Sequence, residues 1–474
     1  MTGTTRTAGL GLVACGALAG CTLITDSFRT NDFSGDPFPI YIGRESGAVM
    51  VGLREPGGPD LAAVLDVLSP VTVTDPGIDK PTTLTTSDLI LLGRGSPTDP
   101  EFDVPRARLH AAEVISLHPC AKPEEEPDGT PTPSVCFVGR PGQSQQYDAI
   151  IGANVLAGDA LRLRLGNEDA DQRPTPQAFL LADIGGDERD RTFACDVVFP
   201  SPYRGGGTLL IAGTEVPFGG RRVTLQACLG SDPDPAVDPV TMQPIPQAAR
   251  GGDALLVMST GIGVSLLGET AYERYRQAIL LRQQYPLRNP APPPPPSPLD
   301  ALPDASAFLP SGQVFGRRVL IDRIALAAAS SSSPRAPCRQ AYAHRVMLED
   351  RLMSETPDWP CANGDPFCSV PAVVELEPLG GLEVLVVPDG NATLQALRAE
   401  LRPDQPEVDG ILGADALRLA EIDVDYPHDR VLMRCTSPST RCVARPALAA
   451  AADLCQVSRC IGTQIDRCID PTGP

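Results

Sequence analysis

Two short segments of the chain carry residue types that could take part in acid–base chemistry. Asp66 ends one apolar run, and Ser259 ends another. The residues that follow are Val67, Leu68 and Ser69 in the first segment and Thr260 and Gly261 in the second. Two carboxylates a few ångströms apart can share one proton and together activate a water molecule. These segments offer one carboxylate and one hydroxyl, which is half of that arrangement.

A recurring motif lies downstream of both segments. Residues 147–156 and 408–417 each contain an acid, two aliphatic residues, Gly, Ala, then Asn or Asp, and a closing Leu. Upstream of each copy, one apolar run enters a short loop and a second apolar run leaves it, at residues 61–73 and 254–267. Because the same order occurs twice, the sequence predicts a duplicated folding unit.

This ordered repetition resembles the pepsin-like and retropepsin-like aspartic proteases. In that family each half carries Asp-Thr-Gly on a loop, and a later strand with two aliphatic residues and Gly threads beneath the loop. The segment most similar to the family is 409–433, which begins with Asp-Gly-Ile-Leu-Gly. The resemblance covers roughly residues 36 to 435 in outline. It implies two related β lobes whose loops face each other.

The composition also predicts a mainly β protein. The 474 residues include 51 prolines and 44 glycines between short Val, Leu and Ile runs, which is typical of strands joined by turns. Long helical periodicity is scarce, and the better helix candidates are 269–281 and the alanine-rich segment 441–457. The predicted organisation is a first protease-like lobe at 36–195, a second at 196–435 with a Pro/Ser-rich insertion at about 285–335, and a Cys-rich tail at 436–474.

In the first loop the resemblance makes Asp66 the candidate catalytic acid. Val67 and Leu68 replace the Thr and Gly that follow the acid in the family, and Ser69 completes the predicted cleft loop. The family's Thr hydroxyl braces the facing loop and its Gly lets backbone approach the substrate, and neither Val nor Leu can do this. The alternative role for Asp66 is structural, as a carboxylate that accepts backbone N–H bonds and caps its loop.

The second loop has the reverse defect. Thr260 and Gly261 are retained, but Ser259 stands where the family has its second acid. A lone carboxylate beside a serine hydroxyl has no partner with which to share a proton. A serine hydrolase is not indicated either, because neither Ser259 nor Ser69 lies in a Gly-x-Ser-x-Gly turn. The sequence therefore predicts a non-catalytic relative of the proteases.

Three functions follow from this interpretation. The leading hypothesis is a body that binds an extended peptide or protein in the cleft between the lobes, through main-chain hydrogen bonds along a sheet edge. The first alternative is an aspartic peptidase with an altered dyad that uses Asp66, completed by dimerisation. The second alternative is a structural envelope lipoprotein whose Cys-rich tail is the interaction surface.

The amino terminus predicts export and a lipid anchor. Arg6 precedes an apolar run at 8–18, which is too short to span a bilayer, and the run ends in Leu-Ala-Gly-Cys at 18–21. This resembles a bacterial lipobox, so 1–20 is the expected signal peptide, Cys21 the lipidation site and 21–35 a tether. Thr22, rather than Asp, favours the outer membrane. An ordinary secretory signal with a chance cysteine is the alternative.

The cysteines agree with an oxidising compartment. Of the 14, two belong to the signal segment, and the remaining 12 contain no Cys-x-x-Cys pair. Disulfides are therefore favoured over a zinc site, and no metal or cofactor is predicted. The local candidates for pairing are Cys120 with Cys136, Cys361 with Cys368, and Cys435 with Cys442.

The charge excludes one class of partner. The formal net charge is −20, and Lys80 and Lys122 are the only lysines. Binding to nucleic acid requires clustered Lys and Arg to neutralise phosphates, so no nucleic acid partner is predicted. Beyond the amino terminus no apolar stretch reaches the length of a membrane helix, and the membrane is expected as a partner only through the lipid anchor.

Overall fold

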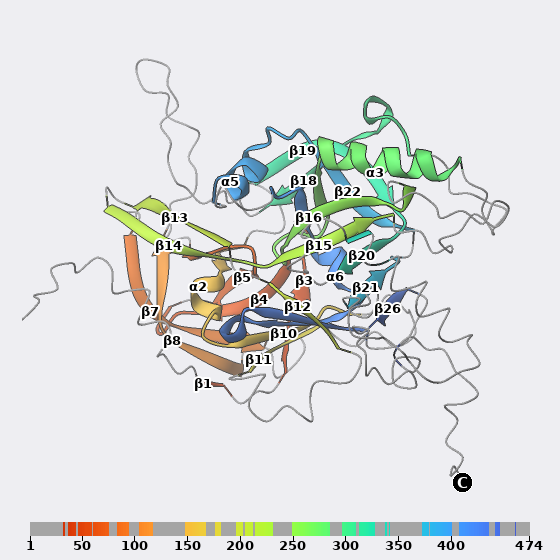
Figure 1. Cartoon of the computed structure of the whole chain (residues 1–474). Coiled ribbons are helices and arrows are strands. Elements are labelled where there is room, and N and C mark those ends of the chain that lie inside the picture. The colour runs from red at the N-terminus through yellow and green to blue at the C-terminus, as the bar shows by residue number, and fades with distance from the viewer. Residues whose placement is uncertain are drawn as a thin grey trace, which may run out of the picture.

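The protein is mainly β in a computed structural model of the whole chain (Figure 1). The residues described are 32–33, 37–43, 46–58, 60–74, 83–93, 104–116, 147–166, 176–181, 196–201, 204–211, 214–230, 249–284, 296–309, 312–327, 337–338, 341, 372–378, 380–400, 407–435, 441–445 and 460. We call residues 32–181 the first half and residues 196–445 the second half.

An eight-stranded sheet belongs to the first half, in red and orange in Figure 1. Its strands are β1 (Asp32–Phe33), β3 (Tyr41–Ile42), β4 (Val49–Arg54), β5 (Asp60–Leu65), β6 (Thr72–Thr74), β7 (Thr83–Gly93), β8 (Val104–Ser116) and β9 (Ala149–Ile151). The order across the sheet is β1-β8-β6-β9-β5-β4-β3, and β7 pairs with β4 and β8.

A ten-stranded sheet belongs to the second half, in green and blue. Its strands are β15 (Thr224–Leu229), β16 (Gly252–Met258), β17 (Ser265–Gly268), β18 (Asp304–Leu309), β19 (Gly312–Ile321), β20 (Ile324–Ala327), β21 (Val373–Leu376), β22 (Leu382–Val387), β23 (Gly410–Leu412) and β26 (Cys442–Arg445). The order is β18-β19-β22-β17-β23-β16-β15-β20-β21-β26.

The two sheets share a central pairing pattern. In the first half β5 is parallel to β9, β9 is antiparallel to β6, and β6 is parallel to β8. In the second half β16 is parallel to β23, β23 is antiparallel to β17, and β17 is parallel to β22. The central strands β9 and β23 are buried along their whole length, which explains their continuous aliphatic sequence. The motif that repeats in the sequence therefore corresponds to a repeated strand pairing.

A six-stranded sheet joins the halves. Its strands are β2 (Phe38–Pro39), β10 (Ala160–Arg164), β11 (Gln177–Leu181), β12 (Val197–Pro200), β24 (Glu421–Asp425) and β25 (Arg430–Arg434). The order is β12-β25-β24-β10-β11-β2, so β10 of the first half pairs with β24 of the second. One fold therefore contains both halves.

Ion pairs reinforce this junction. Arg162 of β10 donates twice to Asp423 of β24, at 2.6 Å in each case. Arg164 pairs with Glu421, and the same carboxylate accepts from Arg434 at 2.9 Å. Glu421 and Asp423 are nearly inaccessible to solvent. Buried charges of this kind are tolerated only when they are paired, so each acid here depends on an arginine of a neighbouring strand.

Few helices lie among the described residues. They are α2 (Ala153–Leu156), α3 (Glu269–Arg282), α5 (Ala392–Glu400) and α6 (Ala414–Leu417), with 3-10 turns η4 (Leu299–Ala301) and η6 (Tyr426–His428). The prediction of a helix at 269–281 is confirmed by α3. The prediction at 441–457 is wrong where it begins, because β26 pairs with β21 at 442–445 and sheet pairing overrides the helical propensity of alanine.

The predicted insertion at about 285–335 also needs correction. Strands β18, β19 and β20 lie within it and belong to the ten-stranded sheet. Ile321, Ile324 and Leu326 are fully buried, so this part of the segment is core. Most of the proline run lies outside the described residues. A separate hairpin of β13 (Arg204–Ile211) and β14 (Thr214–Arg222) precedes the second sheet.

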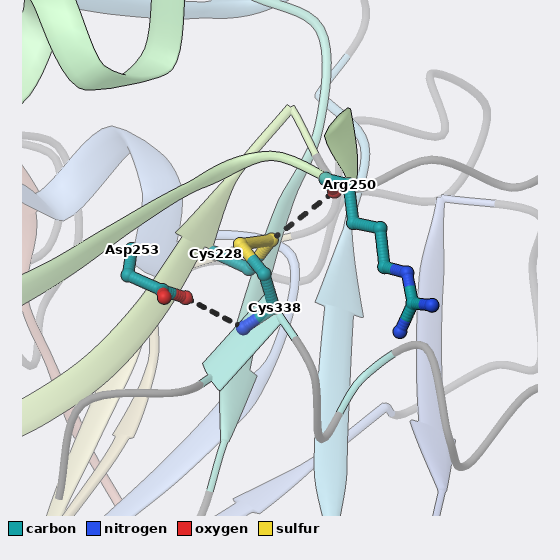
Figure 2. The surroundings of a disulfide bond; sticks show 4 residues. All are labelled: Cys228, Arg250, Asp253 and Cys338. Atoms are coloured by element: carbon teal, nitrogen blue, oxygen red, sulfur yellow. Dashed lines mark hydrogen bonds between the residues drawn. A yellow bond between two sulfur atoms is a disulfide. The ribbon is translucent and has the colours of Figure 1, made fainter. Parts of the chain in front are cut away.

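Two disulfides lie among the described residues. Cys435 pairs with Cys442, as the sequence predicted. Cys228 pairs with Cys338 across 110 residues, which the sequence did not indicate. Figure 2 shows this second bridge, where the Cys338 amide donates to the Asp253 carboxylate at 2.8 Å. The candidate pairs Cys120 with Cys136 and Cys361 with Cys368 lie outside the described residues.

The expected signal peptide, Cys21 and most of the tether also lie outside the described residues. Within the described ranges, none of the helices has both the length and the apolar character that crossing a membrane requires.

Candidate functional site

The two loops singled out in the sequence occupy matching places in the two sheets. Asp66 follows β5, and its amide donates to the Ile151 carbonyl of β9 at 3.0 Å. Ser259 follows β16, and its amide donates to the Leu412 carbonyl of β23 at 2.9 Å. Each loop is thus fixed by the strand that carries the aliphatic pair of the repeated motif.

The acids of the repeated motif are structural in both halves. A carboxylate oxygen of Asp148 accepts the Ala62 amide at 2.9 Å, and one of Asp409 accepts the Leu255 amide at 2.8 Å. The backbone amides of these two acids donate in return to the Ala62 and Leu255 carbonyls. Each acid therefore binds the strand that leads into its loop. They hold the strands in register.

The glycines of the motif allow the backbone to pass close beneath each loop. A Cβ atom on Gly152 would lie 2.3 Å from the Val71 carbonyl oxygen, and one on Gly413 would lie 2.4 Å from the Gly263 carbonyl oxygen. Both distances are too short for real atoms, so only glycine fits. The Gly152 amide donates to the Thr72 hydroxyl and the Gly413 amide to the Ser265 hydroxyl, each at 3.0 Å.

The loops bring Asp66 and Ser259 together. The Ser259 hydroxyl donates to Oδ1 of Asp66 at 2.9 Å. The same oxygen accepts the amides of Leu68 at 2.9 Å, Gly261 at 3.0 Å and Thr260 at 3.3 Å. The carboxylate therefore caps its own loop and the facing loop at once, which matches the structural role weighed for it in the sequence.

Thr260 braces the first loop from across the junction. Its hydroxyl donates to the Leu65 carbonyl at 2.6 Å and accepts the Val67 amide at 3.1 Å. Val67 has no hydroxyl with which to return this bracing. A side-chain hydroxyl of the second loop therefore braces the first loop, and Val67 makes no equivalent contact in return.

Gly261 and Leu68 occupy equivalent positions but differ in surroundings. A Cβ atom on Gly261 would lie 2.6 Å from Cγ of Asp66, so the carboxylate uses the space that this glycine leaves. Leu68 packs into an apolar cluster of the second half that includes Val257 and Ile262. Ser69 lies apart from this contact, since its hydroxyl donates to the Val71 carbonyl of its own half.

The whole contact is closed to solvent. Asp66 is 3% exposed, and Ser259 and Thr260 are 0% exposed. Burial raises the pKa of Asp66, while the hydrogen bonds from Leu68, Ser259 and Gly261 and the charge of Arg222 oppose that rise. Among the described residues, no second carboxylate hydrogen-bonds to Asp66. The arrangement holds the two loops together through a buried carboxylate and a buried hydroxyl.

The sequence did not indicate two further features. Tyr426, in η6, is buried in the electrostatic neighbourhood of Asp66, and burial raises its pKa. An open polar pocket of about 540 Å³ lies between the halves, lined by residues that include Ile42, Ser46, Val264, Glu383, Asp415 and Arg418. Five separate segments of the chain contribute to this pocket, so no local sequence pattern indicates it. The described residues contain no cluster of His, Cys, Asp or Glu suited to a metal ion.

Comparisons with known proteins give structural similarity alone. No protein-family model matches the sequence, and no curated protein matches it. Among solved structures the chain is similar to basic 7S globulin from soybean and to an aspartic proteinase from Irpex lacteus. Each is 12% identical with a TM-score of 0.35 over 85% of this chain, and the similarity spans 95% and 97% of those chains. We base the function below on the strand pairing and hydrogen bonds of this chain.

Proposed function

We propose that this protein is an exported lipoprotein with a non-catalytic, two-lobed body of the pepsin type that binds extended polypeptide. The observation that carries the proposal is the hydrogen bond from the Ser259 hydroxyl to Asp66 at 2.9 Å. It joins two loops in equivalent positions of two similarly paired sheets. A hydroxyl therefore fills the place from which a second carboxylate would share the proton of Asp66.

The burial of this contact supports a structural role for Asp66. Four donors, three of them backbone amides, converge on one oxygen of its carboxylate. A catalytic acid must come within hydrogen-bond distance of its substrate, and Asp66 is almost inaccessible. An altered-dyad peptidase formed by dimerisation would need this closed contact to open, because Ser259 of the same chain already occupies the facing position.

Binding of polypeptide is supported by what remains open between the halves. The pocket of about 540 Å³ lies within the size range of small-ligand sites and is bounded by both halves. A cleft that no longer cuts a chain can still hold one. The fold therefore keeps a place for a ligand after losing the second acid.

The lipid anchor is the second part of the proposal. Leu-Ala-Gly-Cys at 18–21 supports lipidation of Cys21, removal of 1–20 and attachment to the bacterial envelope, on the outer membrane. Expression in a bacterial host with labelled palmitate tests this. The wild-type chain should be labelled and Cys21→Ser should not. Equal labelling of both proteins would overturn the anchor at this position.

The test of the body uses the purified full chain and fluorescently labelled casein as an unfolded substrate. We expect the anisotropy of casein to rise on binding and no cleavage to occur at acidic or neutral pH. Cleavage that disappears in Asp66→Asn would overturn the non-catalytic assignment. Absence of any binding would overturn the assignment of polypeptide as ligand, and leave the structural role of Asp66 to be judged by the stability measurements below.

A further inference from the structure

We infer that polypeptide binds as an added strand along the outer edge of β18, the edge that faces away from β19, beside the exposed ring of Phe315. This inference rests on the proposed function and names the strand that carries the ligand. β18 is the end strand of the ten-stranded sheet. It pairs with β19, and no strand among the described residues pairs with its outer edge. An end strand presents N–H and C=O groups with which an extended polypeptide can pair.

The pairing of β18 with β19 determines which backbone groups lie on the outer edge. The Pro303 carbonyl accepts the Arg318 amide at 2.9 Å, so it points toward β19. Successive residues of an antiparallel strand point alternately toward and away from their partner, and the register along β18 is unbroken. Asp304, Ser306 and Phe308 therefore direct their amides and carbonyls away from β19. An extended chain offers its own amides and carbonyls at the same alternate-residue spacing.

A large apolar side chain lies beside this edge. Phe315 of β19 is directly opposite Ser306 in the register, so the two side chains lie on the same face of the sheet. Phe315 is 69% exposed, more than any other large apolar side chain of the described residues, and Ser306 is also exposed. Because Ser306 is small, a large apolar side chain of an added strand can reach over it to the Phe315 ring. Exposed aromatic rings are common anchors of binding surfaces.

The opposite face of the same two strands is fixed in the core. Ala307 and Leu309 of β18 and Val314 of β19 belong to one apolar cluster of the second half. The only charged side chain of β18 is Asp304, and its carboxylate lies 2.9 Å from Nη1 of Arg317. The edge is therefore held in strand geometry before a ligand arrives, which lowers the entropy lost on binding.

The two ends of the ten-stranded sheet differ in how open they are. At the far end, β26 has four residues, and its Cys442 is joined to Cys435 by a disulfide. β18 has six residues, without proline, lysine or a bulge. Proteins commonly protect edge strands by shortness or by such residues and irregularities. The β18 end is therefore the better place for an added strand.

A second copy of the chain is the competing occupant of this edge. Each copy has a formal net charge of −20, and two such copies repel each other. A neutral or basic polypeptide meets no such repulsion. The charge therefore favours a polypeptide of another protein over self-association.

The test measures the fluorescence anisotropy of a labelled, end-blocked peptide, Lys-Thr-Val-Thr-Leu-Thr-Val-Thr-Lys, on the full chain. Ser306→Pro removes one outward amide without removing a hydrogen bond to β19, and should weaken binding by at least about tenfold. Ser306→Ala keeps that amide and should change the affinity by less than about twofold. Phe315→Ala should weaken binding by about tenfold without disturbing the fold, because the ring is exposed.

Val198→Ala is the matched control for the loss of an exposed apolar side chain. Val198 is 38% exposed and lies on β12, an end strand of the six-stranded sheet. Its replacement should leave the affinity for the peptide unchanged. If Val198→Ala weakens binding as much as Phe315→Ala does, the peptide does not select the β18 edge and the inference is overturned.

Hydrogen exchange reports on the edge itself. In the free chain the Ser306 amide should exchange fast and the Ala305 and Ala307 amides slowly, and the peptide should slow Ser306 alone. A slow Ser306 amide in the free chain would show that the edge is already covered. Dimers that Ser306→Pro dissociates would assign the edge to a second copy. Either result overturns the inference, as does an absence of peptide binding or an affinity that neither Ser306→Pro nor Phe315→Ala changes. The casein measurement separately decides the proposed function.

Discussion

The loop that carries Asp66 and the loop that carries Ser259 are built on the same framework and differ at their tips. In each half a motif acid accepts a strand amide, a motif glycine passes under the loop, and a hydroxyl accepts the amide of that glycine. At the tips, one loop has a carboxylate followed by Val and Leu. The other has a hydroxyl followed by Thr and Gly.

This difference separates the requirements of folding from those of acid chemistry. The framework contacts involve buried backbone groups, which cost free energy if left unpaired, and they are present in both halves. An acid at both loop tips would be required only if the two carboxylates shared a proton. Here they form one asymmetric junction in which Ser259 and Thr260 donate to the first half and Asp66 accepts. The comparison predicts equal effects for framework changes and unequal effects for tip changes.

The largest effect is expected at the motif glycines. Gly152→Ala and Gly413→Ala should each lower the free energy of unfolding by about 4 kcal/mol or more, because the new methyl group would meet a carbonyl oxygen at 2.3 or 2.4 Å. Urea denaturation measures this. Gly390→Ala is the control, since no atom lies within 4 Å of its added Cβ. A large loss at only one of the two motif glycines would break the equivalence of the halves.

A second carboxylate at the junction should be the next most costly change. Ser259→Asp places it against buried Asp66 and should lower the free energy of unfolding by about 3 kcal/mol at neutral pH. Because two buried carboxylates in contact cannot both be ionised, their pKa values would be raised in the folded state. The loss in free energy of unfolding should therefore become smaller as pH falls and one carboxylate takes up a proton. Denaturation at several pH values measures it. A loss that does not depend on pH would contradict the facing geometry.

Removing the bracing hydroxyl of Thr260 is expected to lower the free energy of unfolding by less than Ser259→Asp does. Thr260→Val leaves the Leu65 carbonyl and Val67 amide without that partner and should cost about 2 kcal/mol. Thr72→Val is the matched change within the first half, since Thr72 is equally buried. Hydrogen exchange distinguishes them. The Val67 amide should exchange faster only in Thr260→Val, and faster exchange in both variants would show that the bracing is not specific.

The smallest effect is expected for Asp66→Asn, which preserves an oxygen acceptor and removes the charge. Burial raises the pKa of Asp66 above its ordinary value of 3.8. A raised carboxyl pKa gives stability that is fully present below the unfolded value and declines as pH rises through the folded value. The wild-type chain should therefore lose stability relative to Asp66→Asn between acidic and neutral pH. A relative gain over that range would show that the pKa is lowered instead.

Much of the framework could be predicted from the sequence because its signals are local. The acid, aliphatic pair and glycine of each motif act within one strand and one turn, and their two copies lie in matching strands. The pairing of Cys435 with Cys442 was accessible for the same reason, since only seven residues separate them. Asp66 and Ser259 were found as a pair through the repetition of these local signals.

The parts that were missed depend on contacts between distant segments. Cys228 and Cys338 are 110 residues apart, and nothing near either one indicates its partner. The strands at 304–327 follow a proline run that suggested an insertion, yet pairing with β15 and β22 makes them part of the ten-stranded sheet. The start of the alanine-rich segment became β26 because β21 offered a strand edge. The pocket needs both halves to be in place before it exists.

The most direct test of the central claim is the cleavage of labelled casein at acidic pH by the purified full chain and by Asp66→Asn. If Asp66 joins two loops and the second acid is absent, both proteins should leave casein intact while the wild-type chain still binds it. Cleavage by the wild-type chain that Asp66→Asn abolishes would contradict this, and would make Asp66 a catalytic acid.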